Sequence, residues 1–321
     1  MKDKILKILK NNKDKVISGE QIAKELNITR SYVSKTIKEL TSKGYNIKSE
    51  NRIGYIYLDD KKILNKEYIE SNIKKSKELI ILEKINSTNT FLKELAKNKK
   101  LNNVVAIAEE QTSGRGRLGR TFVSNRNQGI YMSILIRPNF SIEHAKKITC
   151  LACVATSKAI EKLTGLDTKI KWVNDIYINN KKLCGILTEG STLFELGVME
   201  YVIIGIGINC YKQDFGHEIN NIATSIEDET NEIVSKNDLI IEIVNQLDYY
   251  LDNIMDNKYM DEYISKSFVI GKKVLIIQGS NQYNVEIINI NNDGELIVKD
   301  DNNIIKVISS GEITKMVVSN E

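Results

Sequence analysis

Three glycines and three arginines alternate between Gly114 and Arg120, within the segment Gln-Thr-Ser-Gly-Arg-Gly-Arg-Leu-Gly-Arg of residues 111–120. Residues 104–108 before it and 129–136 after it are apolar, and we predict that both are buried strands. Arginine grips phosphates and carboxylates through paired hydrogen bonds, and glycine lets the backbone approach a ligand closely. The pattern therefore predicts a loop that hangs between two strands and closes around an anion; a mobile basic surface loop is the alternative.

A chain of 321 residues is too long for one ordinary core, so we expect two or three domains. No run of eighteen apolar residues occurs, and no membrane span is expected. Four cysteines are too few for a disulfide scaffold, which favours a reducing cytoplasm as the location. With His144 and His217 as the only histidines, a histidine triad or metal cage is not expected, and no metal-binding residue is predicted.

Residues 1–58 differ from the rest of the chain in charge, with 13 basic and 6 acidic side chains against 33 and 36 in the remainder. Residues 2–11 show helical spacing, Ser18 and Gln21 form a capping box, and Thr29 can cap a second short helix. Two short alternating runs, 45–49 and 53–58, follow with a polar turn at residues 50–52 between them, and together they predict a hairpin.

This order is typical of a winged helix-turn-helix domain, with the helix-turn-helix itself from Gly19 to Lys38, and it indicates operator DNA as a partner. The residues expected to contact DNA carry hydroxyl or basic side chains: Ser18, Thr29, Arg30, Ser31, Tyr32, Ser34, Lys35 and Lys38. A three-helix interaction module that does not bind DNA is the alternative.

The first domain is expected to end at residue 62. Beyond it, the pattern divides the chain into a polar, lysine-rich linker with some helix (63–78), a mixed α/β domain (79–268) and a small β-barrel (269–321). Within the α/β domain, residues 87–89 begin a helix, and further helices are expected over 142–163 and 237–266. Strands are expected over 169–178, 182–189 and 196–209, with a turn at Asn179-Asn180-Lys181 between the first two.

Strand pairing in this region should bring Lys171, Asp175 and Lys182 together. Charged groups in an apolar setting are costly unless they serve a ligand, so these three are candidate site residues. A structural ion pair is the alternative reading of the same pattern.

Four motifs together resemble those of the bacterial biotin–protein ligases that also repress the biotin operon, and the resemblance extends over nearly the whole chain. They are Gly-Arg-Gly-Arg-Leu-Gly-Arg at 114–120, Lys-Trp-Val-Asn-Asp at 171–175, Lys-Leu-Cys-Gly-Ile-Leu at 182–187 and Ser-Thr-Asn at 87–89. The resemblance implies an α+β, multidomain fold: a winged helix-turn-helix, a catalytic domain of the class II synthetase-like biotin/lipoate ligase type, and an SH3-like barrel.

The family's activity, as the resemblance implies it, uses biotin and ATP, with Mg²⁺ as MgATP, to make biotinyl-5′-adenylate. Biotin then passes to a lysine of the biotin carboxyl carrier domain of acetyl-CoA carboxylase, and the adenylate-bound protein forms a homodimer that represses biotin genes. Catalytic roles fall to Lys182, Arg117, Lys171 and Asp175. The implied biotin contacts are Ser87, Thr88, Asn89, Gln111, Arg115, Gly116, Arg117 and Lys182, and the implied nucleotide contacts are Arg117, Arg120, Phe122, Lys171, Asn174 and Asn209.

Two positions depart from the family pattern. Val173 stands where proline is usual, and Phe122 where several members have tryptophan near the adenine; a phenylalanine can still stack on a base. Two other functions fit part of the pattern. A lipoate–protein ligase shares the catalytic fold but usually shows an arginine before a glycine triplet and a downstream histidine, which this chain lacks. A non-catalytic biotin-sensing repressor would not need Lys171, Asp175 and Lys182.

Overall fold

The computed structural model describes residues 1–42, 45–50, 53–58, 61–138, 141 and 144–316. The chain divides into two compact units: unit 1 holds residues 1–74 and 235–241, and unit 2 holds residues 75–234 and 242–321. Helix α8 (Lys236–Asp252) contributes residues to both units. The finer domain limits expected from the sequence, at residues 62, 78 and 268, stay predictions.

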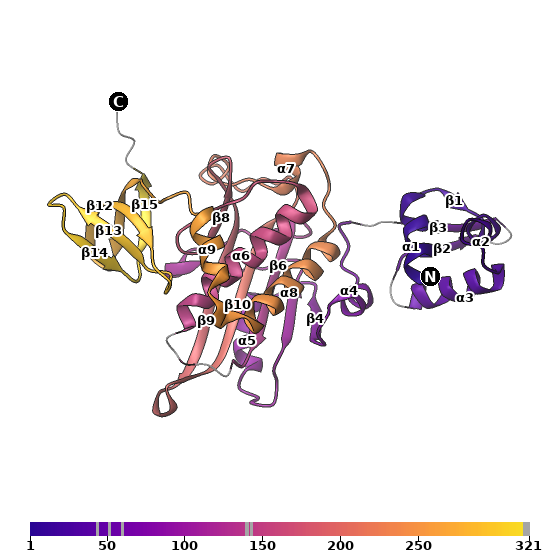
Figure 1. Cartoon of the computed structure of the whole chain (residues 1–321), viewed down its shortest axis with the longest axis horizontal. Helices are drawn as coiled ribbons and strands as arrows, with labels where there is room; N and C mark the ends of the chain where they lie inside the picture. Colours follow the sequence, from indigo (N-terminus) through magenta and orange to yellow (C-terminus); the bar gives the residue numbers. More distant parts are fainter. Residues whose placement is uncertain (43–44, 51–52, 59–60, 139–140, 142–143, 317–321) are drawn as a thin grey trace. The chain divides into compact units, whose positions relative to one another are not determined.

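Unit 1 begins with a small helical domain closed by a hairpin (Figure 1). Its helices are α1 (Lys2–Asn11), α2 (Gly19–Leu26) and α3 (Arg30–Ser42), and its strands β1 (Val16–Ile17), β2 (Ile47–Glu50) and β3 (Gly54–Tyr57) pair in the order β1-β3-β2. Apolar side chains at helical spacing fill its core: Ile5, Leu9, Ile22, Val33 and Leu40 are fully buried. The predicted helices and hairpin are confirmed, while the turn expected around residues 51–52 lies outside the described residues.

Side chains fix where the helices of this domain begin. Ser18 Oγ accepts from the Gln21 amide at 3.1 Å, and Gln21 Oε1 accepts from the Ser18 amide at 2.9 Å, so the predicted capping box is confirmed. Thr29 Oγ1 accepts from the Tyr32 amide at 3.2 Å and caps α3. The turn between α2 and α3 is made by Asn27, whose φ of 53° places it in the left-handed region.

A helix forms in the segment predicted to be a linker. In α4 (Lys66–Asn72), Tyr68 and Ile69 are buried. The Tyr68 hydroxyl donates to Asp238 Oδ1 on the first turn of α8 at 2.8 Å, and it accepts from Lys10 Nζ at 3.3 Å. Asn237 Nδ2 also donates to the carbonyl of Ile63 at 2.8 Å. The segment is therefore held against α8 within unit 1 rather than freely exposed.

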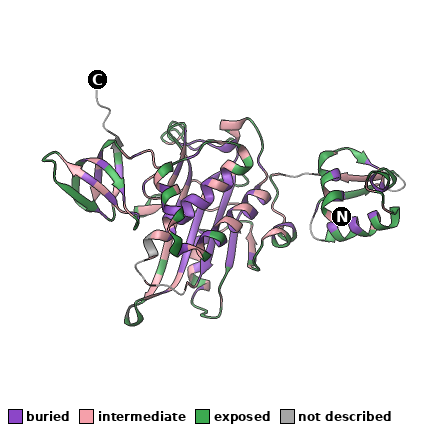
Figure 2. Ribbon diagram, in the orientation of Figure 1, coloured by how far each residue is buried: buried purple, intermediate pink, exposed green. Residues whose placement is uncertain are grey.

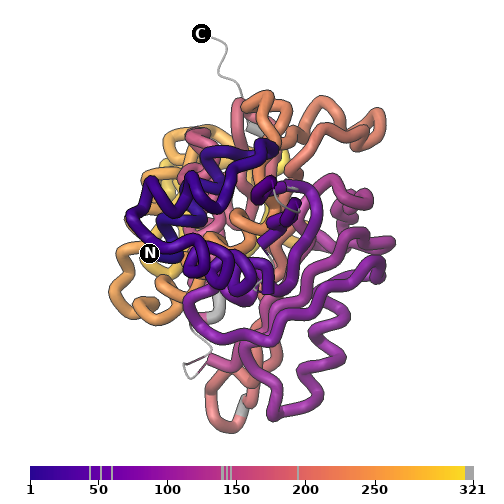
Figure 3. The backbone as a smooth tube through the Cα atoms, turned by 90° about the vertical axis from the view of Figure 1, so that its right-hand side faces the viewer, coloured from indigo at the N-terminus to yellow at the C-terminus, as the bar shows by residue number. Residues whose placement is uncertain are grey.

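Seven of the described strands form the central sheet of unit 2, in the order β4-β5-β6-β10-β9-β8-β7. Their bounds are β4 (Glu78–Leu82), β5 (Val104–Ala108), β6 (Gly129–Ile136), β7 (Lys169–Lys171), β8 (Asp175–Ile178), β9 (Lys181–Leu193) and β10 (Val198–Asn209). β4 and β5 are parallel and joined through α5 (Thr88–Leu95), as Figures 1 and 3 show, and the other neighbours are antiparallel.

One strand prediction is corrected by this sheet. Residues 169–178 were expected to form a single strand, but the chain turns at residues 172–174 and folds back as the β7–β8 hairpin, pairing Lys171 with Asp175. The predicted turn at Asn179 and Asn180 is confirmed, with positive φ at both residues. Sequence pattern missed the first turn because residues 172–174, Trp-Val-Asn, include no glycine or proline to mark a break in the run.

Helices α5 and α6 (Ala145–Thr164) cover opposite faces of the sheet. Leu92 of α5 packs in one cluster with Ile203 of β10, which pairs with Glu189 of β9. Thr149 of α6 donates to Thr188, the neighbour of Glu189, at 3.0 Å. Because successive strand residues point to opposite faces, the two helices lie on different sides. Buried residues gather in the central strands and α6 (Figure 2), and β5 and β6 are buried throughout.

The remaining elements of unit 2 are short helices and a C-terminal β module. The helices are α7 (Ile226–Thr230) and α9 (Lys258–Lys266), with 3-10 turns at η1 (Arg117–Gly119), η3 (Phe194–Leu196) and η4 (Ile254–Asp256). The expected start of α6 at residue 142 lies outside the described residues, which place the helix from Ala145.

The C-terminal module has β11 (Lys273–Gln278), β12 (Asn281–Ile290), β13 (Leu296–Asp300), β14 (Ile305–Ile308) and β15 (Glu312–Met316), paired in the order β14-β13-β12-β11-β15. Val274, Ile276, Ile287 and Val298 form its buried core. This agrees with the predicted small barrel, but β15 was not recognised as a strand. The indole of Trp172 donates to the carbonyl of Gly294 at 2.9 Å and ties the module to the end of β7.

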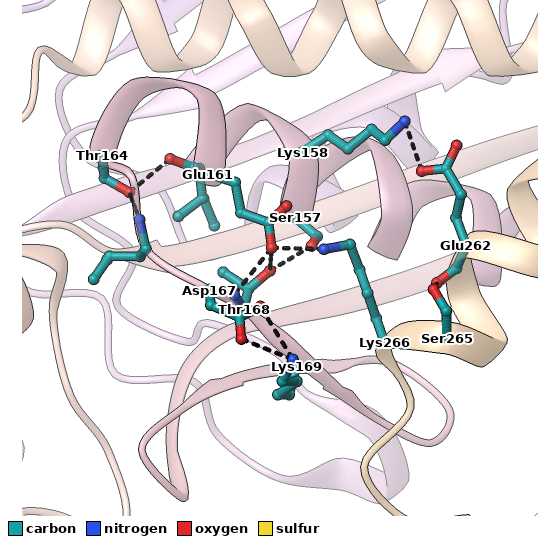
Figure 4. A network of polar contacts seen from close by, with 12 residues as sticks. Ser157, Lys158, Glu161, Thr164, Asp167, Thr168, Lys169, Glu262, Ser265 and Lys266 are labelled. Atoms are coloured by element: carbon teal, nitrogen blue, oxygen red, sulfur yellow. Dashed lines mark hydrogen bonds and ion pairs between the residues drawn. The ribbon is translucent and has the colours of Figure 1, made fainter.

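A polar network ties α6 and α9 to the segment that leads into β7 (Figure 4). Glu161 Oε1 accepts from Lys266 Nζ at 2.6 Å, from the Thr168 amide at 3.0 Å and from the Thr168 hydroxyl at 2.8 Å. Lys158 of α6 pairs with Glu262 of α9 at 2.6 Å. Because Thr168 directly precedes β7, this network fixes the strand that carries Lys171.

We expect Glu161→Ala to lower the free energy of unfolding by about 1–3 kcal/mol, because it leaves the amide of the buried Thr168 without its acceptor. The midpoint of urea unfolding measures the change. Lys169→Ala is the control: it breaks only the exposed pair with Asp167 and should shift the free energy by no more than about 0.5 kcal/mol. Equal shifts in the two variants would contradict a role for this network.

Candidate active site

A cavity of about 300 Å³ lies in unit 2. It is enclosed by the glycine–arginine loop (residues 114–120), the N-terminus of α5, strands β7 to β10 and the C-terminal module. It lies on the face of the sheet that α5 covers, because Gly205 and Asn209 of β10 share a strand face with Ile203. Every ligand-site residue predicted from the sequence lines it: Ser87, Thr88, Asn89, Gln111, Arg115, Gly116, Arg117, Arg120, Phe122, Lys171, Asn174, Asp175, Lys182 and Asn209.

The glycine–arginine loop forms a tight backbone hairpin beside this cavity. The Gly116 amide donates to the carbonyl of Arg120 at 2.7 Å, and the Phe122 amide donates to that of Gly114 at 2.9 Å. A side chain at Gly114 would put its Cβ 2.4 Å from the carbonyl oxygen of Phe122, so the hairpin requires glycine there. The predicted loop between two strands is confirmed, with η1 at its tip.

Two arginines of the loop contact the C-terminal module. Arg117 donates from Nη1 to Asn174 Oδ1 at 3.3 Å and from Nη2 to the carbonyl of Gly311 at 3.2 Å. Arg120 Nη1 lies 2.5 Å from Glu312 Oε1 of β15. Glu312 lines the cavity, and sequence reasoning missed it because its strand lies far along the chain and in a different module.

Two lysines and a carboxylate meet at the side of the cavity formed by β7, β8 and β9. Lys182 Nζ lies 2.8 Å from Asp175 Oδ1, and Lys171 is the strand partner of Asp175. Burial lowers the pKa of Lys171, while the carboxylates of Asp175 and Glu312 oppose that shift. The three residues do meet as predicted. The ion pair considered as the alternative is also present, and its members line the cavity, so a structural and a ligand role are compatible here.

The floor of the cavity is formed by glycines of β9 and β10 beneath an aromatic ring. A Cβ at Gly207 would lie 2.7 Å from the ring of Phe122, so glycine leaves the space that this ring fills. Phe122 also meets Tyr131 edge to face, with ring centroids 6.4 Å apart. Asn209 at the end of β10 donates to the carbonyl of Thr224 at 3.0 Å.

A polar row at the start of α5 forms another wall of the cavity, which Ser87, Thr88, Asn89 and Gln111 line. The Thr88 amide and hydroxyl donate to Gln111 Oε1 at 2.9 and 3.2 Å, and Ser87 caps α5. Behind this wall, Ser133 of β6 and Glu189 of β9 hydrogen-bond to Asn89 and complete the row, and sequence reasoning did not single them out. For Ser133, the available signal was a serine within the otherwise apolar strand 130–136. For Glu189, the signal was that residues two apart in β9 share a face, which places Glu189 on the same side as Gly185 and Leu187 of the cavity.

In unit 1, the residues predicted to contact DNA lie along the start and outer face of α3, except for Ser18, which lies at the start of α2. Arg30, Ser31, Tyr32, Lys35 and Lys38 are exposed, and Ser34 is half-buried. The hydroxyls of Ser18 and Thr29 cap α2 and α3, so their side chains are already engaged. No helix in the described part of the chain is long and apolar enough to cross a membrane.

Two regions of the chain match known protein families, one in the domain that holds the cavity and one in the N-terminal helical domain. Residues 81–209 match the Biotin/lipoate A/B protein ligase family, and residues 2–56 match an HTH domain. The sequence is 37% identical over 233 residues, 71% of each chain, to the bifunctional ligase/repressor BirA of Bacillus spizizenii. The chain belongs to the bifunctional ligase/repressor family.

Two further relatives of this ligase/repressor extend the comparison. The bifunctional ligase/repressor BirA of Escherichia coli is 26% identical over 303 residues, 92% of each chain. A solved structure of the biotin protein ligase from Aquifex aeolicus in complex with biotin and ATP superposes with a TM-score of 0.63 at 26% identity, covering 74% of this chain and 98% of that one. The chain is thus a ligase joined to a repressor-type DNA-binding domain, as predicted.

Proposed function

We propose that the cavity of unit 2 binds biotin and ATP and joins them as biotinyl-5′-adenylate. A biotin carboxylate oxygen attacks the α-phosphorus of ATP, and pyrophosphate leaves. The amine of a lysine on the carboxyl carrier domain of acetyl-CoA carboxylase then attacks the acyl carbon, and AMP leaves as the amide forms. The observation that carries this proposal is the convergence of loop, polar row and paired lysines on one cavity in a ligase of this family.

The positive groups around the cavity match the charge that develops in the first step. A carboxylate and a triphosphate repel each other, and Arg115, Arg117 and Lys182 can neutralise them in a site held away from water. The hairpin of the loop would shield the adenylate from hydrolysis. Lys171, Arg120, Asn174, Asn209 and the ring of Phe122 are proposed to contact the nucleotide.

Biotin is proposed to lie against the polar row. Ser87, Thr88, Asn89 and Gln111 offer hydrogen bonds to its ureido ring, and Arg115, Gly116, Arg117 and Lys182 lie toward its carboxylate. In the second step the carrier lysine must lose a proton, since its free pKa is about 10.4. Asp175 is the proposed acceptor of that proton.

Mg²⁺ is proposed to arrive on the ATP phosphates, which is how this ion commonly enters nucleotide sites. Two carboxylates line the cavity, Asp175 and Glu312, and each lies against a cation in the structure. They are available to hold the hydrated ion once the phosphates engage Lys182 and Arg120. Bound there, the ion would supply positive charge to the phosphates.

A single-turnover assay tests the ligase proposal. Purified chain is mixed with labelled ATP and biotin, and then with a carrier domain. We expect adenylate and pyrophosphate to appear first and biotinylated carrier second. A non-catalytic sensor would bind biotin without forming adenylate, and a lipoate ligase would prefer lipoate; either result would overturn the proposal.

Unit 1 supports a second activity of the same chain, repression of biotin genes from a DNA operator. One small basic domain contacts one half-site, so firm binding needs two copies on a two-fold operator. We propose that the adenylate favours a homodimer formed through the ligase body, and that the carrier competes for the same surface. The reducing cytoplasm is the proposed location, in keeping with four free, buried cysteines.

We expect DNA binding by the full chain to tighten when biotin and ATP are added together, because the adenylate binds the dimer-competent state more strongly. Fluorescence anisotropy at fixed salt measures it, with either ligand alone as the control. Equal affinity for DNA with and without the adenylate would contradict the coupling between ligand and DNA binding, but it would not contradict the proposed ligase activity.

A further inference from the structure

The polar row beside α5 begins at a half-buried carboxylate, Glu189 of β9, and continues through the buried side chains of Asn89, Ser133 and Thr88. Asn89 donates from Nδ2 to Glu189 Oε2 at 2.8 Å and to the carbonyl of Leu187 at 3.2 Å. Both partners can only accept hydrogen bonds, so the amide of Asn89 has one possible orientation. Its oxygen must then face Ser133, whose hydroxyl lies 2.6 Å away.

The fixed orientation of the Asn89 amide also restricts the hydrogen bonds that the Thr88 hydroxyl can make. Ser133 Oγ lies 2.6 Å from Thr88 Oγ1 as well as from Asn89 Oδ1, and Thr88 Oγ1 lies 3.2 Å from Gln111 Oε1. The proton of the Thr88 hydroxyl is therefore used within the row, on Ser133 or on Gln111. Its remaining lone pair is left for the cavity, so Thr88 meets a ligand as an acceptor.

Burial makes this arrangement restrictive. Thr88, Asn89 and Ser133 are 3%, 4% and 0% exposed, so water cannot replace a lost partner. A Cβ at Gly205 would lie 2.2 Å from Asn89 Oδ1, so Asn89 rests directly on β10 and cannot turn away. Glu189 is itself held from the other side by Lys93 of α5, with Nζ 2.5 Å from Oε1.

We infer that Glu189 is a positioning residue for ligand recognition: it sets the direction of the hydrogen bonds through Asn89, Ser133 and Thr88. The ligand class it favours carries N–H donors at this wall, which a cyclic urea provides and a dithiolane or a plain acyl chain does not. This inference rests on the proposed function, because it assigns the ureido ring of biotin to this wall.

Glu189→Gln tests the inference with little change in shape. The new amide cannot serve both neighbours: its NH₂ group must face either Lys93 or Asn89, and both of these are donors there. We expect the KM for biotin in adenylate synthesis to rise at least about tenfold, the scale of one buried group left unsatisfied. The KM for ATP and kcat should stay within about threefold of wild type.

A second substitution supplies a rescue. Lys93→Met in the Glu189→Gln background removes one donor, so the glutamine can turn its oxygen to Asn89. We expect the KM for biotin to return to within about threefold of wild type. Glu200→Gln is the matched control, since Glu200 lies on the neighbouring strand β10 and pairs with Lys99 and Ser191 rather than with Asn89.

Three results would overturn the inference. They are an unchanged KM for biotin in Glu189→Gln, a parallel rise in the KM values of both substrates as expected for a merely structural defect, and no recovery in the double variant. Failure of the wild-type chain to form adenylate is a separate outcome: it would overturn the proposed function, and this inference with it.

Discussion

Lys182→Ala should lower the rate of adenylate synthesis by at least about a hundredfold, the scale seen when one preorganised charged donor is lost from an active site. Lys182 Nζ lies 2.8 Å from Asp175 Oδ1 and lines the cavity, so the ion pair fixes the cation where a carboxylate and a phosphate must meet. Removing it also leaves the Asp175 carboxylate, which repels both substrates. Single-turnover formation of labelled adenylate measures the effect.

Lys181→Ala is the matched control for this experiment. Lys181 is the preceding residue of β9, is exposed, and is not among the residues lining the cavity, so its loss removes the same charge from the same strand. We expect its rate to stay within about threefold of wild type, as for most surface substitutions. A Lys182→Ala rate in that same range would reject the assignment of Lys182.

The second large effect is expected at α3. Replacing Arg30, Lys35 and Lys38 by alanine in the full chain should weaken binding to a fixed fluorescent DNA duplex by about a hundredfold at low salt. It should also reduce the slope of log affinity against log salt by about three, one for each phosphate contact. The three side chains are exposed on one short helix, and the core of that helix is formed by other residues, Val33, Ile37 and Leu40. Anisotropy titrations at several salt concentrations measure both quantities.

A charge-matched variant separates a DNA-binding surface from general electrostatics. Lys97, Lys99 and Lys100 are exposed residues of unit 2, and replacing them by alanine removes the same net charge. This control should leave the salt slope close to that of wild type. Equal losses in the two triple variants would show that DNA is attracted by net charge alone and that α3 has no special role.

Local patterns determined much of the fold because they act over a few residues. The spans 104–108 and 129–136, chosen for continuous apolar character, are β5 and β6. The capping box at Ser18 and the turn at Asn179 formed where the side chains predicted them, since a cap or a tight turn needs only its immediate neighbours. The loop between β5 and β6 was identified for the same reason, because the backbone freedom of glycine and the charge of arginine do not depend on distant residues.

Other features depend on contacts between distant segments, and no local pattern encodes them. The turn at residues 172–174 divides the expected strand 169–178 in two, and β8 then pairs with both β7 and β9. Tyr68 in the expected linker is buried, and its hydroxyl donates a hydrogen bond to Asp238 of α8, which lies 170 residues further along the chain.

The candidate site divides in the same way. The residues that carry its charge, Arg117, Lys171, Asp175 and Lys182, were predicted because their chemistry is unusual for buried strands and loops. Glu312 and Glu189 were not, because each is an ordinary surface-type residue until Arg120 or Asn89 is brought against it. Sequence by itself determined which groups could act on a ligand. Only the tertiary structure decided which neighbours orient them, since a hydrogen bond joins residues that are close in space, however far apart they stand in the chain.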